Sequence, residues 1–276
     1  MNVIFFGTGP MGWDVFWHTV AMSAPTQLDY RVTGIVRHPD RRIQPEPEAE
    51  AQVNFAALET FRDFNIAVPA ETGSPEFLSW LKDLQPTLGV AAQFRFKLPK
   101  AVLDLFPLGI INIHTGYLPY NRGNYPNVWP IIDGTPAGAS LHYMDEGIDT
   151  GPVIVGEQVP VEPWDTGESL HRKLQGKGVE LFRQQWGQVV AEAKLGRRVP
   201  AEVLTEQGTS HKRADVDALD ALSHGGVELS DQSLGHVLNV LRARTFPPYR
   251  GAWFEAKDSA GKVRRVGVRI TLAPLD

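Results

Sequence analysis

The sequence predicts an α/β fold, because short runs of β-branched residues alternate with segments of helical periodicity along most of its 276 residues. Apolar residues make up 42% of the chain and charged residues 21%, the balance of an ordinary globular protein. No run reaches the roughly 18 apolar residues that could span a bilayer. We expect a mostly parallel sheet with helices on both faces, followed by a small C-terminal helix and β-hairpin.

Each element of the sheet domain is indicated by a local pattern. Apolar and β-branched runs predict strands at residues 3–6, 32–36, 88–92, 109–113, 139–143 and 152–159. Ser74 is a typical helix N-cap, Pro99 suits a first helical turn, and Asp165-Thr166-Gly167-Glu168 has the pattern of a capping box. The expected helices therefore lie at residues 11–22 and 74–84, from residue 99, and from residue 165 to about residue 193.

Periodicity is lost after this last helix. A short helix at residues 233–244, a proline-rich corner at 245–249 and a hairpin at 252–272 are expected beyond it. We therefore expect three parts: a main, catalytic domain at residues 1–193, a linker at 194–214 and a small C-terminal helix and hairpin subdomain at 215–276.

Composition excludes several classes of function. The chain has no cysteine, which removes disulfides, thiol nucleophiles and cysteine-ligated metals. A formal net charge of −5 and short basic clusters argue against a nucleic-acid partner, which needs a clustered basic face. The N-terminal apolar run has no basic leader and enters a glycine turn, as a first strand would. We expect a cytoplasmic protein with neither a nucleic-acid nor a membrane partner.

Glycines follow the first strand at the place where a Rossmann-like sheet carries its dinucleotide fingerprint. The pattern is Gly7-Thr8-Gly9-Pro10-Met11-Gly12. The acidic residue expected at the end of the second strand is missing, and Arg37 would suit only the 2′-phosphate of NADP. The interpretation we favour is a tight strand-to-helix turn in a sheet that binds something else.

Three polar residues indicate catalysis. Asn112 and His114 are two residues apart on one face of a predicted strand, and Asp149 follows in the turn between the next two strands. Ligands of open α/β sheets gather at the carboxyl ends of strands. An amide can hold an oxyanion, an imidazole can move a proton, and a carboxylate can orient and charge the imidazole. These groups suffice to move an acyl unit between nitrogen atoms.

The remaining histidines give no sign of a metal site. No pair among the eight has the spacing of metal ligands, so no metal is expected. His18, His142, His171 and His236 are assigned to core edges or to the surface.

The segments around these residues resemble one enzyme family. Asn112-Ile113-His114-Thr115-Gly116-Tyr117-Leu118-Pro119, Asn121-Arg122-Gly123, Gly138-Ala139-Ser140-Leu141-His142 and Asp145-Glu146-Gly147-Ile148-Asp149-Thr150-Gly151-Pro152-Val153-Ile154 resemble the signature of formyltetrahydrofolate-dependent formyltransferases. The resemblance covers roughly residues 1–190 and implies that Asn112, His114 and Asp149 are catalytic. Many members have His-Pro-Ser where this chain has His114-Thr115-Gly116, so the loop beside the acceptor is expected to differ.

The resemblance implies that N10-formyltetrahydrofolate is the formyl donor. In the family two loops hold the pterin largely through backbone groups. The residues that correspond to them in this chain are Phe94, Arg95, Phe96, Leu98, Asp145 and Ile148. Asn112 and protonated His114 would stabilise the tetrahedral oxygen, His114 would take the amine proton, and Asp149 would raise the pKa of His114 towards the working pH.

The acceptor is indicated by the tail. Methionyl-tRNA formyltransferases carry a larger, basic C-terminal domain, and phosphoribosylglycinamide formyltransferases usually end near the sheet domain. The corner Thr245-Phe246-Pro247-Pro248-Tyr249-Arg250-Gly251-Ala252-Trp253-Phe254 resembles N-formyltransferases of nucleotide-linked amino sugars, although packing of a small subdomain explains it equally well. The candidate acceptor residues are Tyr120, Arg122, Tyr125, Arg244, Tyr249 and Arg250, with the arginines placed to hold a diphosphate or simply to lie on the surface.

The sequence therefore predicts an enzyme that formylates a dTDP- or GDP-linked amino-deoxysugar for lipopolysaccharide O-antigen synthesis. It is expected to form a homodimer through its C-terminal region. Alternatives are another small amine, such as hydroxyornithine or a secondary-metabolite intermediate, an NADP-binding oxidoreductase, and a non-catalytic binding module. The nucleotide and the amino position are left open.

Overall fold

The computed structural model describes residues 1–23, 28–37, 64–220, 234–249 and 251–274. The chain divides into two compact units. The first unit contains Met1–His114, Ala139–Glu157 and Gly176–Thr205, and the second contains Thr115–Gly138, Gln158–Gln175 and Glu206–Asp276. The predicted boundaries at residues 193 and 214 stay a prediction, because each unit is assembled from several stretches of chain.

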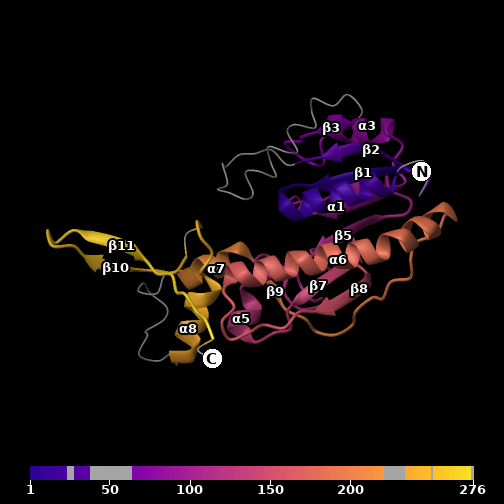
Figure 1. Cartoon of the computed structure of the whole chain (residues 1–276). Helices are drawn as coiled ribbons and strands as arrows, with labels where there is room; N and C mark the ends of the chain where they lie inside the picture. Colours follow the sequence, from indigo (N-terminus) through magenta and orange to yellow (C-terminus); the bar gives the residue numbers. More distant parts are fainter. Residues whose placement is uncertain (24–27, 38–63, 221–233, 250, 275–276) are drawn as a thin grey trace. The chain divides into compact units, whose positions relative to one another are not determined.

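A mostly parallel sheet of seven strands forms the centre of the first unit (Figure 1). The strand order is β3-β2-β1-β4-β5-β7-β8, with bounds β1 (Asn2–Gly7), β2 (Arg31–Val36), β3 (Asn65–Ala67), β4 (Leu88–Ala92), β5 (Ile110–His114), β7 (Gly138–Tyr143) and β8 (Val153–Gln158). The pairs from β3 to β5 are parallel, whereas β7 runs antiparallel to β5. β4 is buried throughout, as expected for a strand with both faces covered. The predicted fold class is confirmed.

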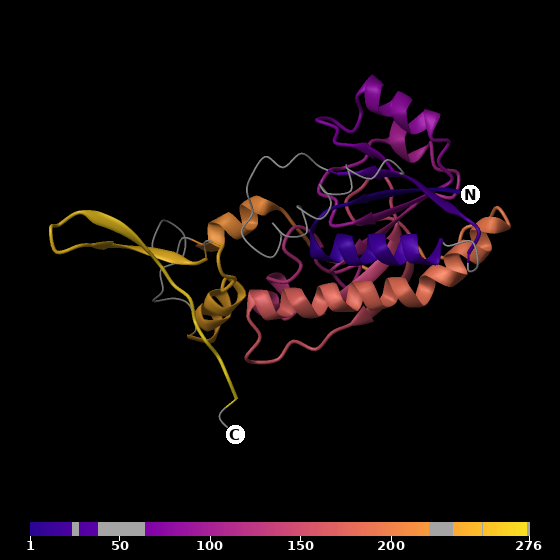
Figure 2. The same cartoon turned by 45° about the horizontal axis from the view of Figure 1, so that its top comes forward.

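Helices cover both faces of this sheet. α1 (Gly9–Met22) and the part of α6 (Gly167–Lys194) that belongs to the first unit share one apolar core, and Figures 1 and 2 show the two helices side by side. α3 (Pro75–Asp83) and α4 (Lys100–Leu103) pack on the other core. Ser74 caps α3 as predicted, because its Oγ accepts the Phe77 N–H at 3.2 Å.

The capping box of α6 lies one residue later than the sequence pattern predicts. Thr166 Oγ1 accepts the Ser169 N–H at 3.2 Å, and Ser169 Oγ accepts the Thr166 N–H at 3.0 Å. Ser169 thus takes the place expected of Glu168. The Asp165 carboxylate is instead buried, where it accepts hydrogen bonds from Ser169 and Lys173.

The second unit has a smaller core around Trp129, Leu170, Leu174 and Ala243. Its helices are α5 (Trp129–Asp133), α7 (Arg213–Asp220) and α8 (Leu234–Ala243), and its strand pairs are β6 (Arg122–Gly123) with β9 (Ser210–His211) and β10 (Trp253–Lys257) with β11 (Val263–Gly267). The β10–β11 pair is the antiparallel hairpin that the sequence predicts.

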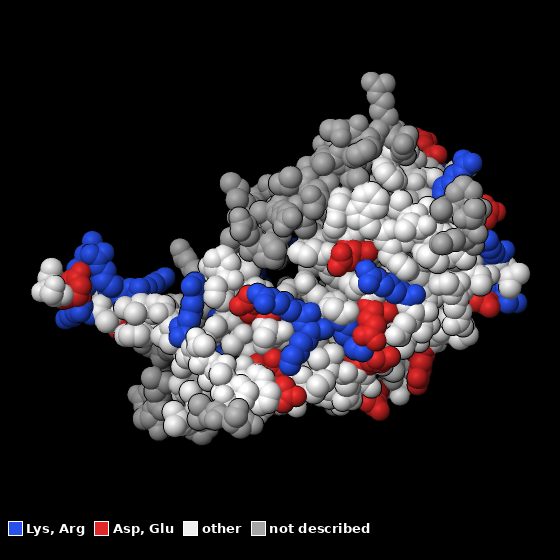
Figure 3. Space-filling view, in the orientation of Figure 1, with Lys and Arg blue, Asp and Glu red and all other residues white. Residues whose placement is uncertain are grey.

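The described surface mixes charges. Lys and Arg side chains lie next to Asp and Glu side chains in the middle of the face in Figure 3, and charges are paired along α6, such as Lys177 with Glu180 at 2.9 Å. Within the ranges that the structure describes, no helix is both long and apolar enough to cross a membrane.

Candidate active site

Two strands place the candidate catalytic side chains. Asn112 and His114 alternate along β5 and therefore leave it on the same face. The antiparallel register pairs Asn112 with His142 and His114 with Ser140 of β7. Directly opposed residues of an antiparallel pair lie close enough for their side chains to interact. This pairing adds His142 to the site, although the sequence assigned that residue to a core edge or the surface.

Asp149 joins these residues into one cluster. Its Oδ2 lies 3.5 Å from His114 Nδ1, and its Oδ1 lies 3.5 Å from both Asn112 Nδ2 and His142 Nε2. The His114 side chain is 8% exposed and that of Asp149 is 13% exposed, so the carboxylate meets these groups in a largely water-free place. The three residues singled out from the sequence are therefore brought together, and His142 is the fourth member.

The contacts of His142 fix the orientation of Asn112. His142 Nδ1 lies 3.0 Å from the Tyr143 carbonyl oxygen, which can only accept, so Nδ1 carries the hydrogen. In the neutral ring Nε2 is then an acceptor, and it receives the Asn112 amide hydrogen at 3.1 Å. The second N–H of Asn112 has the longer contact with Asp149, and a hydrogen bond of 3.5 Å is weak. One amide hydrogen is thus anchored and the other is available.

The loop that carries Asp149 is held by its own polar groups. Asp149 has φ 53°, a left-handed conformation that few residues other than glycine adopt. Asp145 Oδ1 accepts the Gly147 N–H at 2.9 Å and the Thr150 hydroxyl at 2.7 Å. A Cβ on Gly147 would lie only 1.8 Å from Thr150 Oγ1, so a side chain there would displace the Thr150 hydroxyl. Ile148 is 58% exposed and offers an apolar surface next to Asp149.

A second loop begins beside His114. It follows β4, and the register places Ala92 of that strand opposite Ile113. Phe94 packs edge-on against Phe6 with 5.5 Å between ring centroids. Phe96 packs edge-on against Phe94 in turn, with 5.8 Å between centroids, while Arg95 is exposed. Leu98 is buried in the core under α3 and α4, so among the predicted donor residues it is an anchor of the loop.

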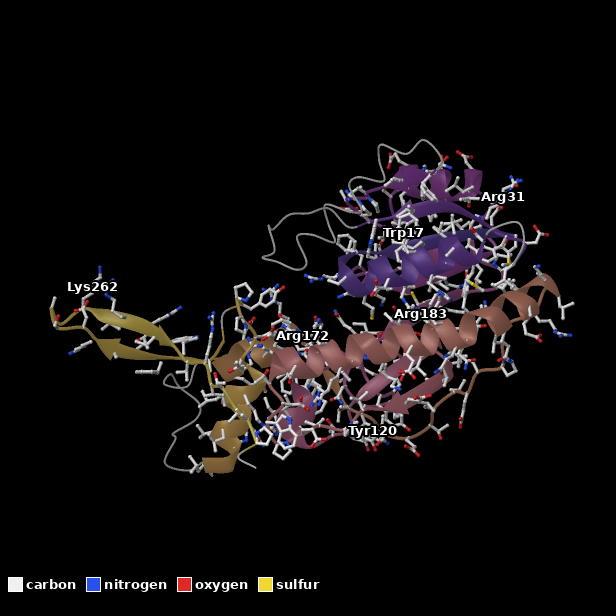
Figure 4. The ribbon with its side chains drawn as sticks, viewed as in Figure 1. Trp17, Arg31, Tyr120, Arg172, Arg183 and Lys262 are labelled. Carbon is white, nitrogen blue, oxygen red and sulfur yellow. The ribbon has the colours of Figure 1, made fainter. Side chains whose placement is uncertain are left out.

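The predicted acceptor residues belong to the second unit. Tyr120 is half-buried in the loop after β5 and is labelled in Figure 4. The Arg244 guanidinium lies 5.9 Å from the centre of the Tyr125 ring, and Tyr249 packs edge-on against Phe246. Arg122 Nε is buried without a hydrogen-bond partner among the described residues. Arg250, the sixth candidate, lies outside the described residues.

Two family models match the chain. Residues 1–185, which include the whole cluster around Asp149, match the formyl transferase family. The chain belongs to this family. Residues 231–274 match the N-formyltransferase dimerization C-terminal domain. The formyltransferase activity that the sequence predicts is therefore confirmed at the level of the family.

Curated relatives of this formyltransferase act on different acceptors. It is 32% identical over 179 residues to the dTDP-4-amino-4,6-dideoxyglucose formyltransferase of Mycobacterium tuberculosis, covering 64% of this chain and 70% of the relative. It is 28% identical over 270 residues to the methionyl-tRNA formyltransferase of Geobacter sulfurreducens, covering 92% of this chain and 82% of the relative.

Solved structures share its fold over all or most of its length. A sugar N-formyltransferase from Shewanella aligns with a TM-score of 0.77 at 20% identity, covering 100% of this chain and 99% of that one. An N-formyltransferase from Helicobacter canadensis, solved with folinic acid and dTDP-3-aminofucose, aligns with a TM-score of 0.63 at 16% identity, covering 91% of this chain and 82% of that one. At these identities the likeness concerns the fold.

Proposed function

We propose that this formyltransferase moves the formyl group of N10-formyltetrahydrofolate to the amino group of a dTDP- or GDP-linked amino-deoxysugar. The observation that carries the proposal is the cluster in which Asp149 contacts Asn112, His114 and His142. It supplies an oxyanion donor, a proton carrier and a carboxylate within the residues that match the family. We place the reaction in the cytoplasm.

The reaction begins when the uncharged amine attacks the formyl carbon and its carbonyl oxygen becomes an oxyanion. The Asn112 N–H that now has the weak 3.5 Å contact with Asp149 donates to this oxygen, while the other N–H stays on His142. Asp149 Oδ2 lies 3.5 Å from His114 Nδ1, which leaves Nε2 of that ring to face the substrate and take the proton of the attacking amine. The bond from carbon to N10 then breaks, and that nitrogen receives the proton.

The donor is held by the two loops of the first unit. Backbone groups from Phe94 to Leu98 and from Asp145 to Ile148 bind the pterin, and the exposed Ile148 side chain covers part of its apolar face. The Helicobacter enzyme of the same fold binds a folate, which supports a folate donor for this chain. Both loops are well anchored, one by buried Leu98 and the other by Asp145.

The acceptor is proposed from three observations. The Mycobacterium relative is named for a dTDP-linked amino sugar. The C-terminal residues match a domain of N-formyltransferases, and the net charge of −5 does not suit a tRNA. Arg122 and Arg244 are candidates for the diphosphate, because the buried Arg122 Nε lacks a partner among the described residues and Arg244 lies over Tyr125.

A direct assay tests this proposal. The protein is incubated with N10-formyltetrahydrofolate and, separately, with dTDP-4-amino-4,6-dideoxyglucose, its GDP-linked counterpart, hydroxyornithine or methionyl-tRNA. Mass spectrometry then detects the formamide. We expect the highest kcat/KM with a nucleotide amino sugar. Preference for methionyl-tRNA or hydroxyornithine would reject the acceptor, and absence of transfer to every amine would reject catalysis.

We also propose that the enzyme is a homodimer through its C-terminal hairpin. Phe254 and Val266 oppose each other across β10 and β11 and are 38% and 39% exposed, an apolar surface on a two-stranded ribbon. Phe254→Glu should shift the protein to a monomer in light scattering. Leu195→Glu, at a residue 64% exposed in the first unit, is the matched control and should leave the dimer intact. A dimeric Phe254→Glu variant would argue against this interface.

A further inference from the structure

Gln93 links the turn after β1 to the loop after β4. The Gly12 N–H donates to Gln93 Oε1 at 3.2 Å, and the Thr8 hydroxyl donates to the Gln93 carbonyl oxygen at 3.1 Å. The backbone of Gln93 has φ 54°, a left-handed conformation that residues other than glycine rarely adopt. The turn after β1 therefore contacts both the side chain and the main chain of Gln93, and the main chain has an uncommon conformation.

The glycine turn is shaped around this side chain. A Cβ on Gly9 would lie 2.6 Å from Gln93 Oε1, and a Cβ on Gly12 would lie 3.0 Å from the Ala92 carbonyl oxygen. Gly9 also has φ 69°, which glycine alone adopts without strain. The Gly12 amide at the start of α1 has its acceptor in Gln93. The glycines at positions 9 and 12 thus leave room for the Gln93 side chain and the Ala92 carbonyl group.

The path of the chain at Gln93 sets the start of the loop that follows. Phe94 next to it is packed on Phe6, and the far end of the loop is fixed by buried Leu98 and by the Thr72 hydroxyl, which donates to the Lys97 carbonyl oxygen at 2.9 Å. A change of conformation at Gln93 would move the near end while the far end stays in place. The backbone groups between them would then lose their arrangement.

We propose that Gln93 is a positioning residue for the formyl donor. By accepting the Gly12 N–H, it keeps the main chain left-handed and presents the backbone of Phe94 to Leu98 to the pterin. A loop already held in its binding conformation loses less entropy when the ligand binds. The inference rests on the proposed function, since it assumes that this loop binds the folate.

Folinic acid binding to the full-length protein tests the proposal by calorimetry. Gln93→Leu keeps the size of the side chain but removes the acceptor, and it should raise the Kd for folinic acid roughly five- to tenfold, the effect of about one hydrogen bond. Gln93→Glu keeps an acceptor at the positive end of α1 and should bind within about twofold of wild type. The KM for the amino sugar should stay unchanged in both variants.

The outcomes distinguish failure of this role from failure of the proposed donor. Equal folinic acid affinity in wild type and Gln93→Leu would overturn the role of Gln93, as would equal losses in the Leu and Glu variants. A matching loss of amino-sugar affinity would show a general disturbance and would also overturn it. If Gln93→Leu does not fold, Gln93→Gly, which suits a left-handed residue, replaces it with the same expected loss. A wild-type protein without affinity for folinic acid would instead refute the proposed donor.

Discussion

His142→Phe is expected to slow formyl transfer without weakening donor binding. The substitution keeps an aromatic ring in a site that is 1% exposed and removes both ring nitrogens. Nε2 is the acceptor that anchors one Asn112 N–H at 3.1 Å, and the remaining contact of that amide, with Asp149, is 3.5 Å long. Without His142 the amide loses its anchor and is free to turn away from the oxyanion.

The size of the effect follows from the lost hydrogen bond. A buried donor left without its partner costs about 1–3 kcal/mol. If this cost falls on the transition state, kcat decreases about 5- to 150-fold, at about 1.4 kcal/mol for each factor of ten. The KM for the donor should change little, because His142 lies on β7 and outside the two loops proposed to bind the pterin.

Single-turnover kinetics with N10-formyltetrahydrofolate and the amino sugar measure this effect, and thermal melting checks the fold. His18→Phe, at a half-buried histidine of α1 that packs edge-on against Phe182, is the matched control and should retain wild-type kcat. A His142→Phe enzyme with kcat within about twofold of wild type would refute the anchoring of Asn112.

Two further predictions concern the cluster around Asp149, and a third concerns His211 in the second unit. Asn112→Ala and His114→Asn should each lower kcat about 10²-fold or more, and the double variant should be little worse than the poorer single one. Steady-state rates measure these effects, and full activity in either single variant would exclude that residue from the mechanism. Thr150→Val should lower kcat about tenfold through loss of a hydrogen bond in the loop that carries Asp149, whereas Thr150→Ser should keep it, and equal rates in the two would contradict this. Burial lowers the pKa of His211 against the opposing pull of nearby carboxylates, so its contribution to stability is complete above about pH 6.5 and is lost as the pH falls through the folded-state pKa. His211→Phe keeps the ring stacked on Trp129 and removes the titration, so its Tm should fall less than that of wild type on acidification; parallel curves would exclude the effect.

The residues at strand ends could be found from the sequence because their chemistry is unusual for their place. An amide and an imidazole at alternate positions of an apolar strand have few structural explanations, and the structure brings both to Asp149. The strands of the sheet could be predicted equally well, because they are short apolar runs. The predicted strand at residues 109–113 is observed as Ile110–His114, a shift of one residue.

His142 could not be identified in the same way. Its role depends on β7 running antiparallel to β5 in a register that pairs it with Asn112, and neither direction nor register is encoded in a local pattern. The stretches of chain that make up each unit could not be predicted for a similar reason. The Thr209 hydroxyl donates to the side-chain oxygen of Asn121, 88 residues earlier in the chain, and accepts the Asn121 N–H. Such distant contacts assign Thr115–Gly138 to the second unit. Strands of two residues, such as β6, have no period to detect.

The glycine turn after β1, which Gln93 contacts, also matters for the redesign of this protein. A protein engineer who wished to install a redox cofactor would find the glycines already present and could be tempted to change only Arg37. The obstacle is Gln93, whose Oε1 accepts the Gly12 N–H at 3.2 Å and would lie 2.6 Å from a Cβ on Gly9, so the side chain fills the space beside the turn. Removing that side chain would open the turn, and under the role proposed for Gln93 it would also release the loop from Phe94 to Leu98. On this proposal, a nicotinamide site and an ordered folate loop would compete for the space that the Gln93 side chain fills.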